Sequence, residues 1–143
     1  MKRLIYSLAF FVCVPATPAF AQQSGGLRVE FQGPGGHSSG AYGRVSALHA
    51  AARAVILIQQ ALPSGSYQIT NLTGGNSVNS IASDGLIEMK LNAANAAAYK
   101  SLVAAVTKAA AEGAAAENAF RGVKAGDLTS GAPATVRSAV TPF

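Results

Sequence analysis

A glycine-rich segment, residues 33–40, separates two different hydrophobic patterns and most constrains how this 143-residue chain can fold. Before it, residues 27–32 alternate between apolar and polar, which is the period of a strand with one buried face. After it, from about residue 44 to residue 62, apolar residues recur every three or four positions, which predicts one face of a helix. The chain must therefore turn from a strand into a helix, and four glycines in eight residues permit that turn.

Two further strand patterns and a second helix pattern follow. Residues 67–72 are rich in β-branched and aromatic residues, and residues 87–91 alternate between apolar and charged. The turn signal at residues 74–76 predicts that these strands form an antiparallel hairpin. Fourteen of the 27 residues from 93 to 119 are alanine, which predicts a long helix. Asn92 is its expected N-cap.

The C-terminal part of the chain has weaker patterns. Residues 122–125 predict a short and weak last strand, and residues 126–143 are expected to form an irregular tail. The order strand, helix, strand, strand, helix, weak strand is the split pattern of ferredoxin-like folds. We therefore predict one α+β domain, a ferredoxin-like βαββαβ sandwich in which two helices cover one face of a four-stranded antiparallel sheet.

The first 21 residues have the composition of a secretory signal peptide. Lys2 and Arg3 precede an apolar run over residues 4–14, and residues 19–21 have the small-x-small form of a signal-peptidase site. The run is about half as long as the ~20 residues that a membrane-spanning helix needs. We expect cleavage near Gln22, a secreted or periplasmic protein, and no membrane association after cleavage.

Cleavage at this site would also fix the redox chemistry and the charge. It removes Cys13, the only cysteine, and so excludes a disulfide within the mature chain. It leaves nine Lys and Arg against six Asp and Glu, a net charge of +3. These charges are spread singly, whereas nucleic-acid binding requires clustered basic residues or stacking aromatics. We expect no nucleic-acid partner.

His37, inside the glycine-rich segment, is the main candidate for chemistry. A histidine presented by such a loop can donate a hydrogen bond or carry a proton for a ligand or a neighbouring active site. The alternative is a surface histidine without a role. His49 falls within the first predicted helix, and we interpret it as structural.

Three other kinds of site are poorly supported. Zinc needs three or four ligands, and the mature chain has no cysteine and only two histidines and two aspartates, none at ligand spacing. A catalytic triad can be written with Ser38, a histidine and Asp84, but no nucleophile-elbow motif is present. The glycines do not form a phosphate-binding loop, because Ala41 and Tyr42 stand where Lys and Ser or Thr are required.

Two segments together resemble one known family. Residues 33–39, Gly-Pro-Gly-Gly-His-Ser-Ser, follow the first strand, and residues 74–81, Gly-Gly-Asn-Ser-Val-Asn-Ser-Ile, follow the second. In this order and at this separation they resemble the dimerisation (lid) domain of the zinc metallopeptidases that include aminoacylase, carboxypeptidase G and succinyl-diaminopimelate desuccinylase. The resemblance covers residues 26–125.

The resemblance implies roles for two residues. In that family the lid is a four-stranded sheet with two helices, inserted into a catalytic domain that carries two zinc ions. Lids pair between subunits through an edge strand and a helix. The histidine at the position of His37 reaches the partner subunit's active site and stabilises the oxyanion, and the asparagine at the position of Asn79 helps to hold the substrate.

The sequence also departs from the family. The zinc ligands and the general base of the family belong to the catalytic domain, which has no counterpart in these residues, so any zinc would lie in a partner's catalytic domain. Ala82 stands where the family usually has proline. Asn92 aligns with a substrate-contacting arginine, and the change removes a carboxylate clamp.

We therefore predict a secreted, stand-alone lid domain that is not catalytic by itself. Its expected partner is a second copy or another lid-containing peptidase. One alternative is an accessory subunit that donates His37 in trans to a separate zinc peptidase or amidohydrolase. Another is a decayed fragment of such an enzyme.

Overall fold

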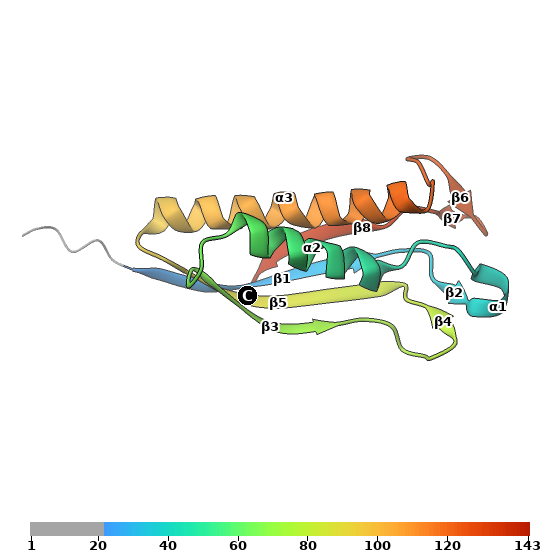
Figure 1. Ribbon diagram of the computed structural model, residues 1–143, viewed down its shortest axis with the longest axis horizontal. Helices are drawn as coiled ribbons and strands as arrows, with labels where there is room; N and C mark the ends of the chain where they lie inside the picture. The colour runs from blue at the N-terminus through green and yellow to red at the C-terminus, as the bar shows by residue number, and fades with distance from the viewer. Residues whose placement is uncertain (1–21) are drawn as a thin grey trace, which may run out of the picture.

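The computed structural model describes residues 22–143, and the predicted signal peptide lies outside them. Two helices cover one face of an antiparallel sheet (Figure 1). The elements are β1 (Gln23–Gln32), β2 (Gly36–His37), α1 (Ser38–Ala41), α2 (Ala47–Ala61), β3 (Tyr67–Thr73), β4 (Ser80–Ile81), β5 (Asp84–Ala93), α3 (Ala96–Phe120), β6 (Leu128–Thr129), β7 (Ala132–Pro133) and β8 (Arg137–Pro142).

The main sheet confirms the predicted α+β fold. Its strand order is β3-β5-β1-β8, and every neighbouring pair is antiparallel. β3 and β5 form the expected hairpin, and α2 and α3 are the two long helices. The sequence patterns therefore predicted the first three strands of the sheet, both long helices and their position on one face.

The core lies between the sheet and the two helices. The alternation in β1 buries Leu27, Val29 and Phe31, and the facing strand β5 buries Ile87, Met89 and Leu91. Residues directly opposite each other in the register, such as Leu27 and Met89, point to the same face and pack together. α2 covers these side chains with Ile58 and a row of buried alanines, and α3 covers them with Val106 and further alanines.

The two helices pack closely because small residues meet at their contact. A Cβ atom added to Gly113 of α3 would lie 2.8 Å from the carbonyl oxygen of Ala50 and 2.8 Å from the Cβ atom of Ala54, both in α2. Real Cβ atoms do not approach other atoms so closely, so no larger residue fits at position 113 without a shift of the helices. The alanine-rich composition thus permits close helix–helix packing at the cost of side-chain volume.

The expected fourth strand was placed wrongly. Residues 122–125 form turns and irregular backbone, and the strand that pairs with β1 is β8, within the tail that was expected to be irregular. Ser138 and Val140 of β8 are only half-buried, so an edge strand here forms with small inward residues and a weak alternating pattern. Asn118 fixes the approach to it, since its side chain donates to the Val136 carbonyl at 3.0 Å and accepts from the Val136 amide at 2.8 Å.

Two strand ends also differ from expectation. β1 begins at Gln23, four residues before the alternating pattern that predicted it, because it pairs with the last residues of β5. The same extension keeps Asn92 inside β5, so Asn92 is not the cap of the second long helix. The N-cap is Asn95, whose side-chain oxygen accepts from the Ala98 amide at 2.9 Å.

The last residue of the chain lies beside the first half of β1. The amide of Phe143 donates to the carbonyl of Gly26 at 3.1 Å, which joins the last residue to β1. β2, β4 and α1 lie toward the other end of the molecule (Figure 1). Within residues 22–143, no helix has both the length and the hydropathy of a membrane span.

Candidate functional site

The glycine-rich loop and the Gly74–Ile81 loop meet at one end of the sheet. A two-residue antiparallel ladder joins β2 to β4 and pairs Gly36 with Ile81 and His37 with Ser80. The Ser38 amide also donates to the Asn79 carbonyl at 2.9 Å. Segments 42 residues apart in the chain are therefore held side by side by backbone hydrogen bonds.

This ladder brings together the two residues that the resemblance singled out. The imidazole Nε2 of His37 lies 3.2 Å from the side-chain amide of Asn79, and both side chains are exposed. The sequence alone did not predict that these two side chains are in contact. Their roles toward a substrate remain predictions.

The two ring nitrogens of His37 have different neighbours. His37 is the N-cap of α1, and the Ser39 amide donates to its Nδ1 at 3.3 Å, with the Ser39 hydroxyl 2.8 Å from the same nitrogen. Its Nε2 faces the side-chain Nδ2 of Asn79, whose Oδ1 accepts from the Ser77 hydroxyl. Contacts on both sides of the ring therefore hold the imidazole in place at this end of the sheet.

Glycine is required where the loop turns back on itself. Gly36 has a φ of +133°, and a Cβ atom there would lie 2.7 Å from the Cβ atom of Ala41. Arg44 holds the loop from outside, since its Nη1 donates to the Gly35 carbonyl at 3.2 Å and its Nη2 to the Ser130 hydroxyl at 3.4 Å. The loop is braced by both the backbone and the β6–β7 hairpin.

The two departures from the family lie in different surroundings. Ala82 is buried, and its carbonyl accepts from the Ala47 amide at 3.0 Å, so it connects the Asn79 loop to the start of α2. Asn92 is exposed near the opposite end of β5 from this loop. Asn92 therefore does not take part in the His37–Asn79 arrangement.

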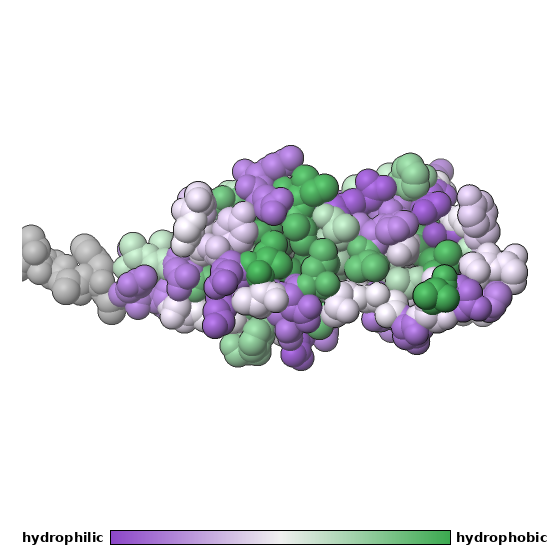
Figure 2. Space-filling view, turned by 60° about the horizontal axis from the view of Figure 1, so that its bottom comes forward, coloured by the Kyte–Doolittle hydropathy of each residue, from purple (hydrophilic) through white to green (hydrophobic). Residues whose placement is uncertain are grey.

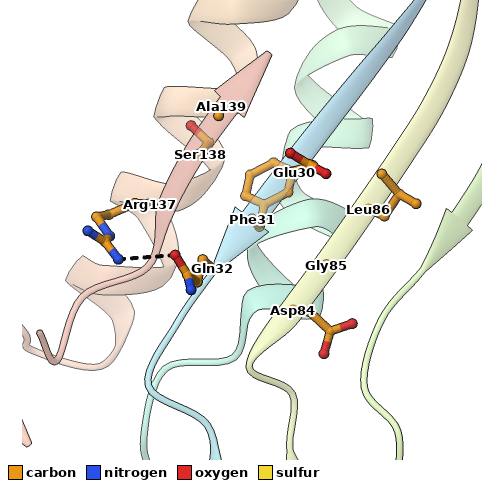
Figure 3. Close-up of a pocket in the computed structure, with 9 residues that line it drawn as sticks. All are labelled: Glu30, Phe31, Gln32, Asp84, Gly85, Leu86, Arg137, Ser138 and Ala139. Atoms are coloured by element: carbon orange, nitrogen blue, oxygen red, sulfur yellow. Dashed lines mark hydrogen bonds between the residues drawn. The ribbon is translucent and has the colours of Figure 1, made fainter. Parts of the chain in front are cut away.

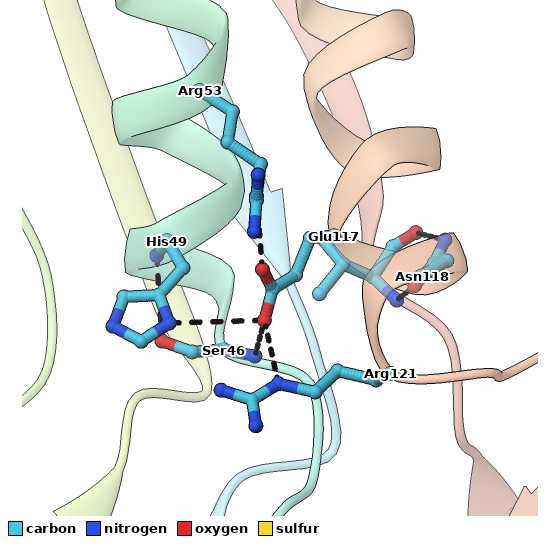
Figure 4. Close-up of polar contacts among 7 residues, drawn as sticks. Ser46, His49, Arg53, Glu117, Asn118 and Arg121 are labelled. Atoms are coloured by element: carbon cyan, nitrogen blue, oxygen red, sulfur yellow. Dashed lines mark hydrogen bonds and ion pairs between the residues drawn. The ribbon is translucent and has the colours of Figure 1, made fainter.

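A second polar cluster, around Glu117, escaped the sequence analysis. Glu117 on α3 is fully buried, and its carboxylate accepts from the Ser46 amide at 3.2 Å, Arg53 Nε at 3.1 Å and Arg121 Nε at 3.3 Å (Figure 4). His49 Nδ1 lies 3.8 Å from the same carboxylate. The cluster joins α2 to α3, and it gives His49 the structural position that we had expected for it.

Hydrogen bonding keeps this buried carboxylate ionised. Burial raises the pKa of Glu117, but the Ser46 amide, Arg53 and Arg121 donate to the charged form, and His49 adds a smaller attraction. The net result is a pKa below the usual range of a glutamate. Arg53 and Arg121 also lie over the Phe120 ring, at 5.1 Å and 5.0 Å from its centroid, which limits their movement.

The open face of the sheet has a hollow of about 580 Å³ at the ends of β1, β5 and β8 (Figure 3). Glu30, Asp84 and Leu86 line it on one side, and Arg137 Nη2 donates to Gln32 Oε1 at 3.1 Å on the other. These charges do not converge on a common point. We assign no chemistry to this hollow.

The described residues do not form a zinc site. Between residues 22 and 143, no three His, Cys, Asp or Glu side chains gather as metal ligands would. The only buried carboxylate in this part of the chain that is ringed by partners, Glu117, is used by two arginines. The zinc that the family implies does not fit these residues, and its location in a partner's catalytic domain stays a prediction.

The fold and the two loops define a ferredoxin-like module that gathers a histidine and an asparagine at one end of its sheet. Comparison with protein families makes the assignment specific. The chain belongs to the peptidase dimerisation domain family, which matches residues 22–118. None of the curated proteins compared with the chain gave a significant match.

Solved structures show the same fold inside larger proteins. A tripeptidase from Staphylococcus aureus is similar with a TM-score of 0.63 and 17% identity, over 85% of this chain and 29% of that one. An aminobenzoyl-glutamate utilization protein from Klebsiella pneumoniae gives 0.61 and 16%, over 89% and 31%. A hydantoinase/carbamoylase family amidase from Burkholderia ambifaria gives 0.61 and 20%, over 87% and 28%. The chain thus spans less than a third of each of these proteins.

Proposed function

We propose that this domain self-associates through the β3 edge of its sheet and the adjoining face of α2. Membership in the peptidase dimerisation domain family supports a dimerisation role. We choose this surface because two exposed apolar residues lie on α2 and on β3, the edge strand of the sheet. Ile56 on α2 is 54% exposed and Leu72 on β3 is 44% exposed.

The β3 edge is suited to pairing. β3 is hydrogen-bonded only to β5 within the described chain, so its outer backbone groups are open to a second strand. A register shift between Ile69 and Asn71 keeps Ile69 and Leu72 on the helix-covered face, opposite the buried residues of β5. From this side of the molecule, hydrophobic residues form a band across the middle, with polar residues on both sides (Figure 2).

The other edge of the sheet, which β8 forms, is less suited to pairing with a second chain. β8 has six residues, begins with Arg137 and ends with Pro142, which has no amide hydrogen to donate. A charged residue and a proline are features that discourage strand pairing. The two edges therefore favour a twofold dimer through β3 rather than an open chain of subunits.

Light scattering over a range of protein concentrations tests this proposal. We expect a dimer for the wild type and a shift to monomer for Leu72→Lys and Ile56→Lys, since each places a charge in the apolar contact. Leu128→Lys is the matched control, because Leu128 is 69% exposed on the β6–β7 hairpin. A wild-type monomer at millimolar concentration, or equal dissociation by all three variants, would overturn the β3 interface.

A second candidate function is donation of His37 in trans to a separate zinc peptidase or amidohydrolase. The exposed His37–Asn79 pair favours it, because the imidazole of His37 is held at the end of the sheet away from Phe143, within reach of a second protein. The measurement adds this protein to a peptidase of the family whose own lid has been deleted. We expect activity to rise with the wild type and not with His37→Ala, while both bind. Equal activities would leave His37 without this role.

We also propose that the protein is exported and cleaved before Gln22. The composition of residues 1–21 supports this. Mass spectrometry of the protein recovered from its producing cells would give a chain beginning near Gln22. A chain that retains Met1 would contradict export by this route.

A further inference from the structure

A groove of about 480 Å³ lies between the start of α2 and the Gly74–Ile81 loop, and the functions proposed above do not use it. Arg44, His49 and Arg121 line one part of it. Leu48, Val78, Ile81 and Ala82 contribute apolar surface, and Ser46, Asn76, Ser77 and Ser80 contribute polar atoms. The groove therefore combines cationic, apolar and neutral polar walls.

The arginines of the groove carry uncompensated positive charge. Arg53 and Arg121 share one carboxylate, that of Glu117, and Arg44 has no acidic partner within residues 22–143. No aspartate or glutamate of the described chain lines the groove. Of these arginines, only Arg44 and Arg121 line the groove, and the one carboxylate that Arg121 contacts is shared with Arg53, so positive charge is in excess there.

Arg121 is held in one place and keeps two donor nitrogens unused. Its Nε donates to Glu117, and its guanidinium lies over the Phe120 ring. Its two terminal nitrogens point away from Glu117 (Figure 4), and within the described chain they make no hydrogen bond. A guanidinium that is fixed at Nε and free at both terminal nitrogens can donate two parallel hydrogen bonds to a carboxylate.

We propose that this groove binds a small organic carboxylate, with Arg121 and Arg44 on the carboxylate and with Leu48, Val78 and Ile81 against its hydrocarbon part. The buried Glu117 is the positioning residue, because it fixes Arg121 without reaching the ligand. Inorganic anions lack the hydrocarbon part and gain only the charge contact. The groove adjoins the His37–Asn79 pair, because its lining residue Ser77 also contacts Asn79. Its lining includes neither Ile56 nor Leu72 of the proposed dimer surface, so its test is independent of the proposed dimer.

Titration of the full chain with phenylbutyrate, followed by amide chemical shifts in NMR spectra, tests this site. We expect saturable shifts at Ser46, Leu48 and Ser77, and a rise in thermal midpoint with ligand concentration. Phenylbutanol has the same hydrocarbon part without the charge, and phosphate has the charge without the hydrocarbon part. Both are expected to bind at least about tenfold more weakly.

Variants distinguish a built site from weak adsorption. Arg121→Gln is expected to weaken phenylbutyrate binding by about tenfold to a hundredfold, and Arg44→Gln, which does not contact Glu117, by about tenfold. Arg137→Gln on the open sheet face removes the same charge at a distance and is the matched control, with unchanged affinity expected. If Arg121→Gln fails to fold, Arg44→Gln and phenylbutanol decide the question. No saturable shifts, equal binding of phenylbutanol or phosphate, or an equal effect of Arg137→Gln would overturn the proposal.

Discussion

The Glu117 cluster and the His37–Asn79 pair are built in opposite ways. Glu117 is fully buried and has four partners, two in α2 (His49 and Arg53), one just before α2 (Ser46) and one just after α3 (Arg121). His37 and Asn79 are exposed and are placed by a two-residue backbone ladder. Side chains position the first, and backbone hydrogen bonds position the second. Substitutions should therefore affect stability at the first site and local geometry at the second.

Glu117→Ala should give the largest effect. It leaves two arginines beside a buried space without their carboxylate, and breaking a buried ion pair in this way costs about 3–5 kcal/mol in the free energy of unfolding. Urea unfolding at fixed protein concentration measures it. Glu112→Ala is the matched control on the same helix, since Glu112 is exposed and pairs only with Lys108 at 3.8 Å, and a change below about 0.5 kcal/mol is expected. Similar losses for both variants would refute the comparison.

Lowering the pH should weaken the Glu117 cluster. The pKa of Glu117 is lowered in the folded state, so its contribution to stability is present above the unfolded value of about 4.3 and is lost as pH falls through the lower folded value. The Arg28 hydrogen bond lowers the pKa of Glu88 in the same direction. We expect the free energy of unfolding to fall below about pH 4, with a smaller slope in Glu117→Gln. If the free energy of unfolding depends on pH equally in wild type and variant, groups other than Glu117 cause the loss of stability in acid.

Gly36→Ala should disturb the loop more than the whole fold. The φ of +133° is unfavourable for alanine, and the added Cβ atom would meet Ala41. We expect a loss of about 1–3 kcal/mol, together with shifted NMR signals of His37 and Asn79. Gly43→Ala is the matched control, because Gly43 also has a positive φ, of +85°, but has open space at its Cβ position. Unchanged His37 signals in Gly36→Ala would show that the ladder does not depend on this glycine.

His37→Ala should have the smallest effect on stability. The side chain is exposed and contacts only Ser39 and Asn79, so we expect a change within about 0.5 kcal/mol. Amide signals of the Asn79 loop should stay near their wild-type positions, because the backbone ladder remains. A loss of more than about 1 kcal/mol would mean that the imidazole supports the fold.

The sequence predicted the parts of the fold that local patterns control. The alternation in β1, the three-and-four spacing in α2 and the alanines of α3 each gave the right element. β8 could not be placed in this way, because an edge strand beside small residues needs little inward apolar surface. The N-cap moved from Asn92 to Asn95 because the length of β5 depends on its partner strand.

The candidate site could be predicted only in part, because its residues come from segments that are far apart in the sequence. Two sequence segments identified His37 and Asn79, but their 3.2 Å contact depends on the β2–β4 ladder, which joins distant parts of the chain. Glu117 was missed because it lies among alanines in a pattern typical of a solvated helix. Its only sequence signal is the spacing of four residues to Arg121, which occurs often on exposed helices.

The hydrogen bond between Phe143 and Gly26 has a consequence for protein engineering. Because the last residue lies beside the first half of β1, both ends of the module lie in the half of the molecule away from the His37 loop, and a host protein could carry it as an insertion in a surface loop. The His37 loop would then lie at the end of the sheet that is farthest from the host. The length of the strands, rather than the linkers, would set the distance between His37 and the host.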